Sequence, residues 1–251
     1  NNVTIQAAGI ALDTHQPSGI INVDVNGQSI SAPILMYLSN GGTIDLTASS
    51  GSQIYGKTLL SGAGNTANLT LNSSAAWTMP DTSPLTNLSI SGGIVKFTPP
   101  SSGYKTLTVN NNLSGSGGTF YLNTNLAAGQ GDCLVIGGNT SGSHNIYITN
   151  QGGVSSANQA LKVVNLDSSK TNTATFSGGS DSGIYRYGVA QGASIPGYSG
   201  VGSATEDYYF YNTLTPSTAV RAASSSVTST NVTWYGEMNE IKKRMGDLRT
   251  G

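Results

Sequence analysis

The sequence predicts an all-β protein: a right-handed parallel β-helix (a solenoid) with a C-terminal β-hairpin cap and a short C-terminal α-helix. Three observations lead to this prediction. A strand-like triplet recurs along the chain, a second apolar series runs between its repeats, and the composition is rich in turn-forming residues.

The triplet is apolar–polar–apolar, as in Leu107-Thr108-Val109, and it recurs at steps of 19 to 27 residues. A period of two residues is typical of a half-buried strand, and its regular recurrence indicates one strand per coil of a solenoid. Since β-strand crossovers are almost always right-handed, we expect right-handed winding. The triplets begin at Val3, Val23, Ile44, Leu69, Leu88, Leu107, Leu134 and Leu161.

The second apolar series lies about half a coil after the first. Each coil should therefore have at least two faces, stacked on the same faces of its neighbours. Its members are Trp77/Met79, Val95/Phe97, Phe120/Leu122, Ile146/Ile148 and Phe176.

Composition supports strands joined by tight turns and excludes several classes of protein. The chain has 251 residues, of which 9% are charged, with 33 glycines and a net charge of −1. A nucleic-acid partner requires clustered Lys and Arg, so none is predicted. The single cysteine, Cys133, excludes an internal disulfide and should pack as a small apolar side chain. No apolar run approaches the ~18 residues of a membrane-spanning helix.

We interpret residues 1–104 as plain β-helix coils and residues 105–211 as a better-protected, capped region. Val135 is apolar at a position that should face outward, which implies that something covers it. Two aromatic β-rich runs, separated by a loop over 190–207, predict a hairpin that covers the open end of the solenoid. The cap residues we expect are Tyr185, Tyr187, Tyr209, Tyr211 and Val135.

Residues 212–230 are rich in Ser, Thr and Ala without an apolar period, so we expect a linker there. Residues 231–251 then carry an apolar series at steps of four and three, which predicts one face of an α-helix. The series is Trp234, Met238, Ile241, Met245 and Leu248.

Several segments occur in an order found in a known family. They are 118–123, 132–136, 142–148, 174–176, 183–187 and 243–249. Through these segments, the part of the chain over residues 105–251 resembles the C-terminal passenger region of pertactin-like (AIDA/pertactin-type) autotransporters. Residues 1–104 resemble that family only as generic β-helix.

The resemblance implies a bacterial type V secretion protein that crosses the outer membrane through its own C-terminal β-barrel translocator. Residues 105–211 would be the autochaperone that nucleates folding outside the cell, and the helix would thread the barrel pore. The barrel itself is expected after residue 251, outside this chain. The implied role is that of an adhesin stalk on the cell surface or in the extracellular space, with a host-surface or neighbouring-cell receptor. No catalytic, cofactor or metal residues are expected.

Two alternatives remain from the residues themselves. Asp24 and Asp45 occupy the same triplet position and would lie one strand spacing apart, about 5 Å, as in a β-helix polysaccharide lyase, a hydrolase or a Ca²⁺ site. Two solvated acids are the simpler interpretation. The other alternative is a trimeric phage-type fibre. A serine hydrolase at 180–183 is disfavoured because a triad needs a positioned histidine, and the chain offers only His15 and His144.

Overall fold

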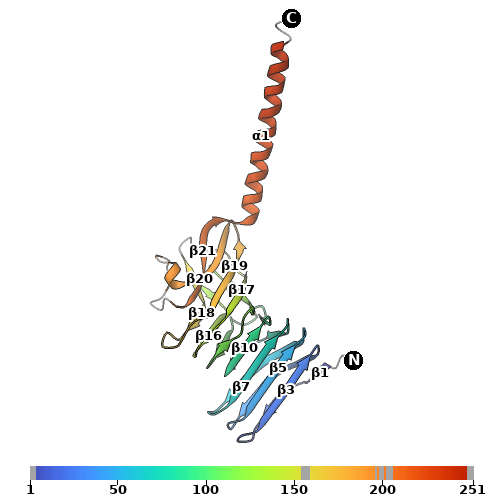
Figure 1. Ribbon diagram of the computed structural model, residues 1–251, viewed down its shortest axis with the longest axis vertical. Coiled ribbons are helices and arrows are strands. Elements are labelled where there is room, and N and C mark those ends of the chain that lie inside the picture. Colours follow the sequence, from blue (N-terminus) through green and yellow to red (C-terminus); the bar gives the residue numbers. More distant parts are fainter. Residues whose placement is uncertain (1–3, 154–158, 196, 198–200, 202–205, 248–251) are drawn as a thin grey trace.

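In the computed structural model the chain is a parallel β-solenoid with one long helix that projects from its C-terminal end (Figure 1). The structure describes residues 4–153, 159–195, 197, 201 and 206–247. The predicted fold class is confirmed, and the solenoid has three faces, in keeping with the expected minimum of two.

The first face is a five-stranded sheet in which every neighbouring pair is parallel. Its apolar side chains point inward in a continuous row, since Leu46, Leu69, Leu88 and Leu113 are direct register partners. The strands are β3 (Ile20–Asn26), β5 (Thr43–Ser49), β7 (Thr66–Asn72), β10 (Asn87–Ser91) and β13 (Leu113–Ser114).

The second face is the longest parallel run and carries the second apolar series of the sequence. Trp77, Val95, Phe120 and Ile146 stack in register, so this series is confirmed as one inward row. The strands are β1 (Thr4–Gln6), β4 (Ser29–Ser39), β6 (Gln53–Ser61), β8 (Ala76–Met79), β11 (Ile94–Phe97), β14 (Thr119–Asn125), β17 (Ser143–Asn150) and β19 (Thr175–Ser182).

The third face begins where β4 and β6 bend across a corner of the coil. The register between β4 and β6 shifts near Ile34, and the residues after the shift pair with one another on this face. On its other edge, the same part of β4 pairs with β2. The other strands of this face are β2 (Ile10–Thr14), β9 (Ser83–Leu85), β12 (Thr106–Val109), β16 (Cys133–Ile136) and β18 (Ala160–Leu166), while the short β15 (Gln130–Gly131) pairs antiparallel with β14.

The first apolar series of the sequence does not form a single ladder. Leu88 pairs with Leu113, whereas Leu107 lies on the third face, opposite Ser83 and Leu134. The prediction of one ladder through Leu88 and Leu107 is therefore wrong. The step between these leucines crosses from one face to another, because each coil carries similar triplets on more than one face.

Two further register assignments also need correction. Val164, not Leu161, lies opposite Leu134. Phe176 lies opposite His144 instead of continuing the row through Ile146, which faces Gly178.

The end of the solenoid is closed by antiparallel strands, as the aromatic runs predict. β20 (Tyr185–Gln191) and β21 (Tyr208–Pro216) form the expected hairpin, with the 3-10 turn η1 (Gly192–Ser194) after β20. β20 pairs with β19 and β21 pairs with β18, so the hairpin joins the second and third faces into one sheet.

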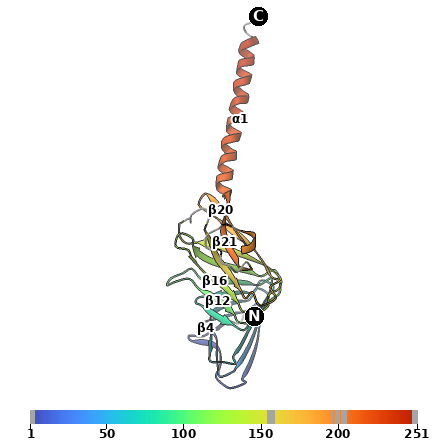
Figure 2. The same cartoon turned by 90° about the vertical axis from the view of Figure 1, so that its left-hand side faces the viewer.

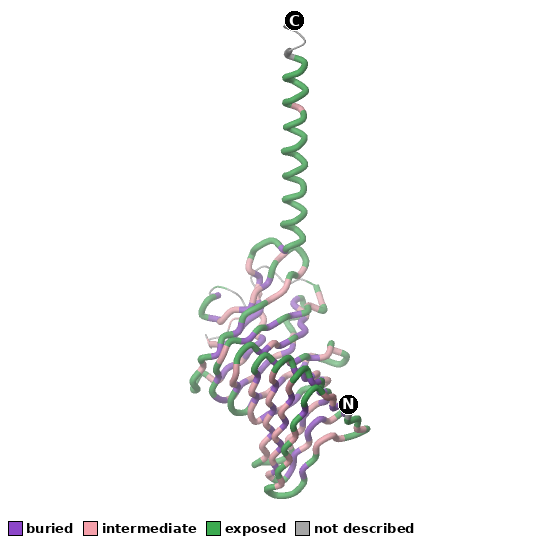
Figure 3. The backbone as a smooth tube through the Cα atoms, turned by 45° about the vertical axis from the view of Figure 1, so that its right-hand side comes forward, coloured by how far each residue is buried: buried purple, intermediate pink, exposed green. Residues whose placement is uncertain are grey.

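The helix α1 (Thr218–Asp247) has 30 residues and begins directly after the cap. The expected linker over 212–230 is therefore the end of β21 and the first part of α1, and the helix is neither short nor begins at 231. Figures 2 and 3 show α1 extending away from the solenoid, with almost every described residue exposed.

Candidate functional site

The cap is built around β21, which lies between β18 on one side and β20 on the other. Phe210 faces Val189 across one pairing and Leu161 across the other. A parallel solenoid ends in unpaired N–H and C=O groups, and an antiparallel strand that pairs on both sides removes them. The two strands of the hairpin therefore pair the exposed edges of two faces: β20 pairs with β19 of the second face, and β21 pairs with β18 of the third.

The inner side of the cap is aromatic. Tyr187 and Phe210 are fully buried with ring centroids 5.2 Å apart, and Phe176 meets Tyr208 edge to face at 5.1 Å. Tyr208 donates its hydroxyl to the Ala174 carbonyl at 3.2 Å, and burial raises the pKa of this tyrosine. The rings extend the solenoid core to its last rung.

The outer side of the cap carries a second small apolar cluster. Tyr209 packs there with Ala160 and Ile195, and Tyr211 contacts its edge. Of the tyrosines expected in the cap, Tyr187 and Tyr209 are fully buried, whereas Tyr185 and Tyr211 are half-buried. Val135, expected under cover, is half-buried between Thr108 and Asn165.

A buried carboxylate anchors β21 to the third face. Asp207 accepts a hydrogen bond from the Leu166 amide at 2.8 Å and forms an ion pair with Lys162 Nζ at 2.6 Å. The Asp207 carboxylate raises the pKa of Lys162 above its ordinary value, and the ammonium lies 5.9 Å from the Tyr209 ring centroid. Burial raises the pKa of the nearby Cys133 thiol to about 11, so this cysteine is an inert packing residue, as expected.

A second buried carboxylate joins three strands one coil earlier. Asp132 accepts from the Lys105 amide at 2.7 Å, and from the amide and side-chain nitrogens of Asn123 at 2.7 and 2.9 Å. Asn123 also donates to the Phe97 carbonyl at 3.1 Å. This acid accepts from two backbone amides and one side-chain amide, so its role is to hold adjacent coils together.

Asp24 and Asp45, the candidate carboxylate pair, are not register partners. Asp24 lies opposite Thr47, and Asp45 lies opposite Asn22 and Asn68. The strands are displaced by two residues relative to the triplet alignment, so the expected side-by-side carboxylates do not occur. This removes the directly opposed carboxylate pair, one strand spacing apart, on which the polysaccharide-cleaving and Ca²⁺ alternatives rested.

Asp45 instead begins a polar ladder that the sequence reasoning missed. Asn68 donates to Asp45 Oδ1 at 2.6 Å, and Asn87 donates to Asn68 Oδ1 at 2.8 Å. The Asn87 oxygen then accepts from the amide of Asn112, and the Asn112 oxygen from the amide of Asn139. The ladder holds successive coils in register along one corner of the solenoid.

Among the described hydrogen bonds, neither histidine contacts residues 180–183, the candidate serine-hydrolase segment. His15 contacts Ser39 Oγ and Asp13 Oδ2, both at 3.0 Å, but Ser39 is nearly buried and its hydroxyl also approaches the Thr14 carbonyl at 3.4 Å. His144 is buried between Phe120 and Phe176, away from any carboxylate contact among the described residues.

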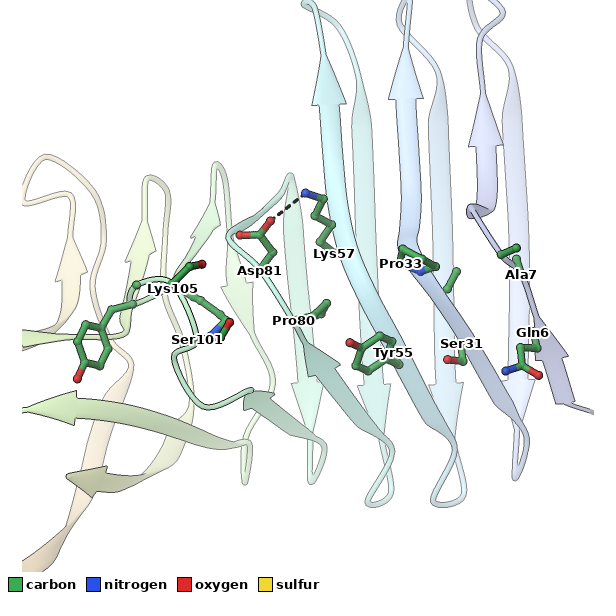
Figure 4. Close-up of a pocket in the computed structure, with 15 residues that line it drawn as sticks. Gln6, Ala7, Ser31, Pro33, Tyr55, Lys57, Pro80, Asp81, Ser101 and Lys105 are labelled. Atoms are coloured by element: carbon green, nitrogen blue, oxygen red, sulfur yellow. Dashed lines mark hydrogen bonds and ion pairs between the residues drawn. The ribbon is translucent and has the colours of Figure 1, made fainter. Parts of the chain in front are cut away.

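A groove of about 640 Å³ crosses the early coils from the end of β1, past β4 and β6, to the loop that precedes β12 (Figure 4). Lys57 and Asp81 reach across it and form an ion pair at 2.9 Å. The hydrogen bond from Lys57 holds the pKa of Asp81 below its ordinary value. Neither histidine nor cysteine is among the described residues that line the groove.

The helix α1 presents an apolar stripe to solvent. Trp234, Ile241 and Met245 are exposed and Met238 is half-buried, while Leu248 lies outside the described residues. A carboxylate of the solenoid caps the start of the helix, since the Thr218 amide donates to Asp181 Oδ2 at 2.8 Å. This hydrogen bond lowers the pKa of Asp181.

The described residues contain neither a metal-binding cluster nor a membrane-spanning helix. In that part of the chain, no group of three or more His, Cys, Asp or Glu residues is placed to hold a metal ion. No described helix has the length and apolar character required to span a membrane.

Comparison with known proteins gives a consistent set of relatives. Residues 85–195 match the Pertactin family model. The BrkA autotransporter of Bordetella pertussis is 30% identical over 214 residues, which cover 82% of this chain and 19% of that protein. The probable autotransporter YpjA of Escherichia coli is 40% identical over 89 residues, 34% of this chain and 6% of that protein. Among solved structures, the Haemophilus influenzae Hap adhesin has 21% identity and a TM-score of 0.43, covering 77% of this chain and 24% of that one.

The chain spans about a fifth or less of the length of these curated autotransporters. The similarity to BrkA covers more of the chain than residues 105–251, so it also includes coils that the sequence alone identifies only as generic β-helix. The match to the Pertactin family model and the similarity to BrkA show that the chain belongs to the pertactin-type autotransporter passengers.

Proposed function

We propose that residues 105–216 are the folding nucleus of this passenger segment, an autochaperone, and that the coils of residues 1–104 are a stalk built onto it. One observation carries the proposal: the β20–β21 hairpin pairs with β19 on one side and β18 on the other, and so joins two faces of the solenoid. In a solenoid each coil contacts only its neighbours, so a coil that is closed on one side is the natural starting point for folding.

Differences in burial between the two ends support this order. The cap buries Tyr187, Tyr209 and Phe210 completely, and large aromatic side chains contribute the most per residue to core stability. At the other end, the inward side chains Ile21 and Val23 of β3 are only half-buried against the core. A coil there gains its burial only when it stacks on one already formed.

Similarity to autotransporters implies secretion to the cell surface or the extracellular space. In the proposed path, α1 occupies the pore of the translocator while the cap folds outside. A 30-residue helix is about 45 Å long, more than the ~30 Å hydrocarbon core of a bilayer. Its exposed apolar stripe would then meet the pore wall instead of solvent.

The proposed role of the stalk is adhesion, with a receptor on a host or neighbouring cell, and it involves no catalytic turnover. The separation of Asp24 from Asp45 argues against the lyase or hydrolase alternative. Low net charge also argues against a nucleic-acid partner.

Refolding kinetics test the nucleus. Tyr187→Ala in the cap and Leu46→Ala in the plain coils each remove a fully buried side chain and should each cost about 2–5 kcal/mol. After dilution from urea, Tyr187→Ala should slow folding, because its contacts belong to the nucleus. Leu46→Ala should leave the folding rate nearly unchanged and accelerate unfolding. If Leu46→Ala slowed folding while Tyr187→Ala mainly accelerated unfolding, the autochaperone role would be contradicted.

A further inference from the structure

We propose that the surface beside Tyr147 binds a neutral pyranose sugar. This inference is independent of the folding role, because it concerns the outer side of the second face and not the core of the cap. It follows from an aromatic stack, an empty rung beside that stack, and a polar cavity that borders the same rung.

The aromatic stack lies on the outward row of the second face. Tyr121 and Tyr147 are register partners on β14 and β17, with ring centroids 5.3 Å apart and planes inclined by 17°. Both rings are exposed, and Tyr147 is 51% accessible. The contact with Tyr121 fixes the orientation of Tyr147 and covers one of its two ring faces.

The next rung leaves the other face of the Tyr147 ring open. Its register partner on β19 is Gly179, which has no side chain to stack on it. A Cβ at Gly179 would lie 2.2 Å from the Tyr187 carbonyl oxygen, so the backbone itself excludes any larger residue. The row of side chains therefore ends in a flat, pre-oriented aromatic platform.

A cavity of about 520 Å³ borders this platform, within the size range of small-molecule sites. It lies near the base of α1, where β17, β19 and β20 meet the first helical residue (Figure 1). Asn145, Asp181 and Arg186 bring an amide, a carboxylate and a guanidinium to its wall. One Asp181 oxygen already accepts from Thr218, and a carboxylate has further acceptor capacity.

These features fit a pyranose better than other ligand classes. The C–H groups on one side of a pyranose ring are weakly positive and pack against the negative face of an aromatic ring. Sugar hydroxyls then pair with planar amide, carboxylate and guanidinium groups at the rim. Asp181 and Arg186 are cross-strand partners of opposite charge, which favours a neutral sugar over a sulfated or cationic one. A peptide that binds by adding a strand would need a free strand edge, and β17 is paired on both sides.

Saturation-transfer difference NMR on the intact chain tests the site. The probes are methyl β-glucopyranoside, methyl β-galactopyranoside, cellobiose and lactose, with a sulfated heparin disaccharide as the charged comparison. We expect transfer to the C–H protons on one side of at least one neutral sugar, with an affinity of about 1 mM. Tyr147→Phe should bind within about twofold of the wild type, whereas Tyr147→Ala should weaken binding about five- to tenfold through loss of stacking.

Tyr55→Ala is the matched control, because Tyr55 is an exposed tyrosine of the same outward row on β6, several rungs away. It should leave sugar binding unchanged, and far-UV circular dichroism should show that all variants are folded. The proposal is overturned if no neutral sugar receives saturation, if Tyr147→Ala binds as well as the wild type, or if only the sulfated disaccharide binds.

Discussion

His144 is a histidine that its surroundings keep neutral. Its ring packs 5.5 Å from Phe176 and 6.0 Å from Phe120, and its Nε2 lies 3.2 Å from the Ser141 carbonyl oxygen. Its buried Nδ1 has no hydrogen-bond partner among the described residues. Burial therefore lowers the pKa of His144 below its ordinary 6.5, since a proton on Nδ1 would have no acceptor.

The depressed pKa predicts a definite pH dependence of stability. The unfolded chain takes up a proton at His144 near pH 6.5, before the folded chain does, so the unfolded state binds more protons between the two pKa values. The contribution of neutral His144 to the free energy of unfolding is therefore fully present above about pH 6.5. It is lost as the pH falls through the pKa of His144 in the folded chain. Urea midpoints at a series of pH values should show this decline, and His144→Gln should lack it. An equal decline in the variant would assign the effect to other groups.

Asp132 should be among the most costly polar residues to remove. Asp132→Ala leaves the buried amides of Lys105 and Asn123 without their acceptor, so we expect a loss of at least about 3 kcal/mol in the free energy of unfolding. Asp24→Ala, at an exposed acid, should change it by less than about 0.5 kcal/mol. Urea titration measures both, and similar losses for the two variants would contradict the role assigned to Asp132.

At the scale of single elements, strands were easier to predict than their register. Alternation identifies Leu69, Leu88 and Leu107 equally well as inward residues, because each face of a coil obeys the same period of two. A better signal was present: Asp45-Leu46, Asn68-Leu69, Asn87-Leu88 and Asn112-Leu113 repeat an acid or amide before the inward leucine. The polar ladder requires that dipeptide, so it identifies Leu113 as the partner of Leu88.

The partners of the cap could not be read from the sequence in the same way. The aromatic runs predict β20 and β21, but the contact of Asp207 with the Leu166 amide joins positions 41 residues apart outside any repeat. The pairing of β21 with β18 is likewise antiparallel and non-local. Only the three-dimensional fold brings such groups together.

The first half of α1 was missed because Ser and Thr disfavour helix interiors. In the structure these side chains bond back to carbonyls of the preceding turn, as Thr228 does to Ser224 and Thr233 to Ser229. This satisfies the hydroxyls without breaking the helix. Composition alone therefore resembles a linker, although the backbone is helical.

We expect α1 to be the least protected element of the isolated chain. It has no packed face, and a solvated helix of this composition is marginal by itself. Amides of 222–245 should exchange rapidly, and Trp234→Ala should change global stability by less than about 0.5 kcal/mol. Strong protection there, or a large loss of stability in the variant, would mean that the helix packs on the solenoid and does not stand free for a pore.

At the scale of the whole molecule, the solenoid has two unlike ends. The C-terminal end is closed by a doubly paired strand, buried aromatic rings and an ion pair to the buried carboxylate of Asp207, whereas the early coils depend on stacking and a polar ladder. Nearest-neighbour coupling then predicts a gradient of stability along the axis, lowest in the early coils. This gradient is the central claim of the proposed folding order.

Native-state hydrogen exchange of the intact chain, followed by mass spectrometry in low concentrations of urea, tests that claim most directly. The amides of β14, β17 and β21 should exchange only through global unfolding, while those of β3 and β5 should open first, at a lower free energy. Val25→Ala, at a buried position of β3, should accelerate exchange in the early coils alone and so serve as an internal control. Uniform exchange along the solenoid, or early coils that open last, would contradict a C-terminal folding nucleus.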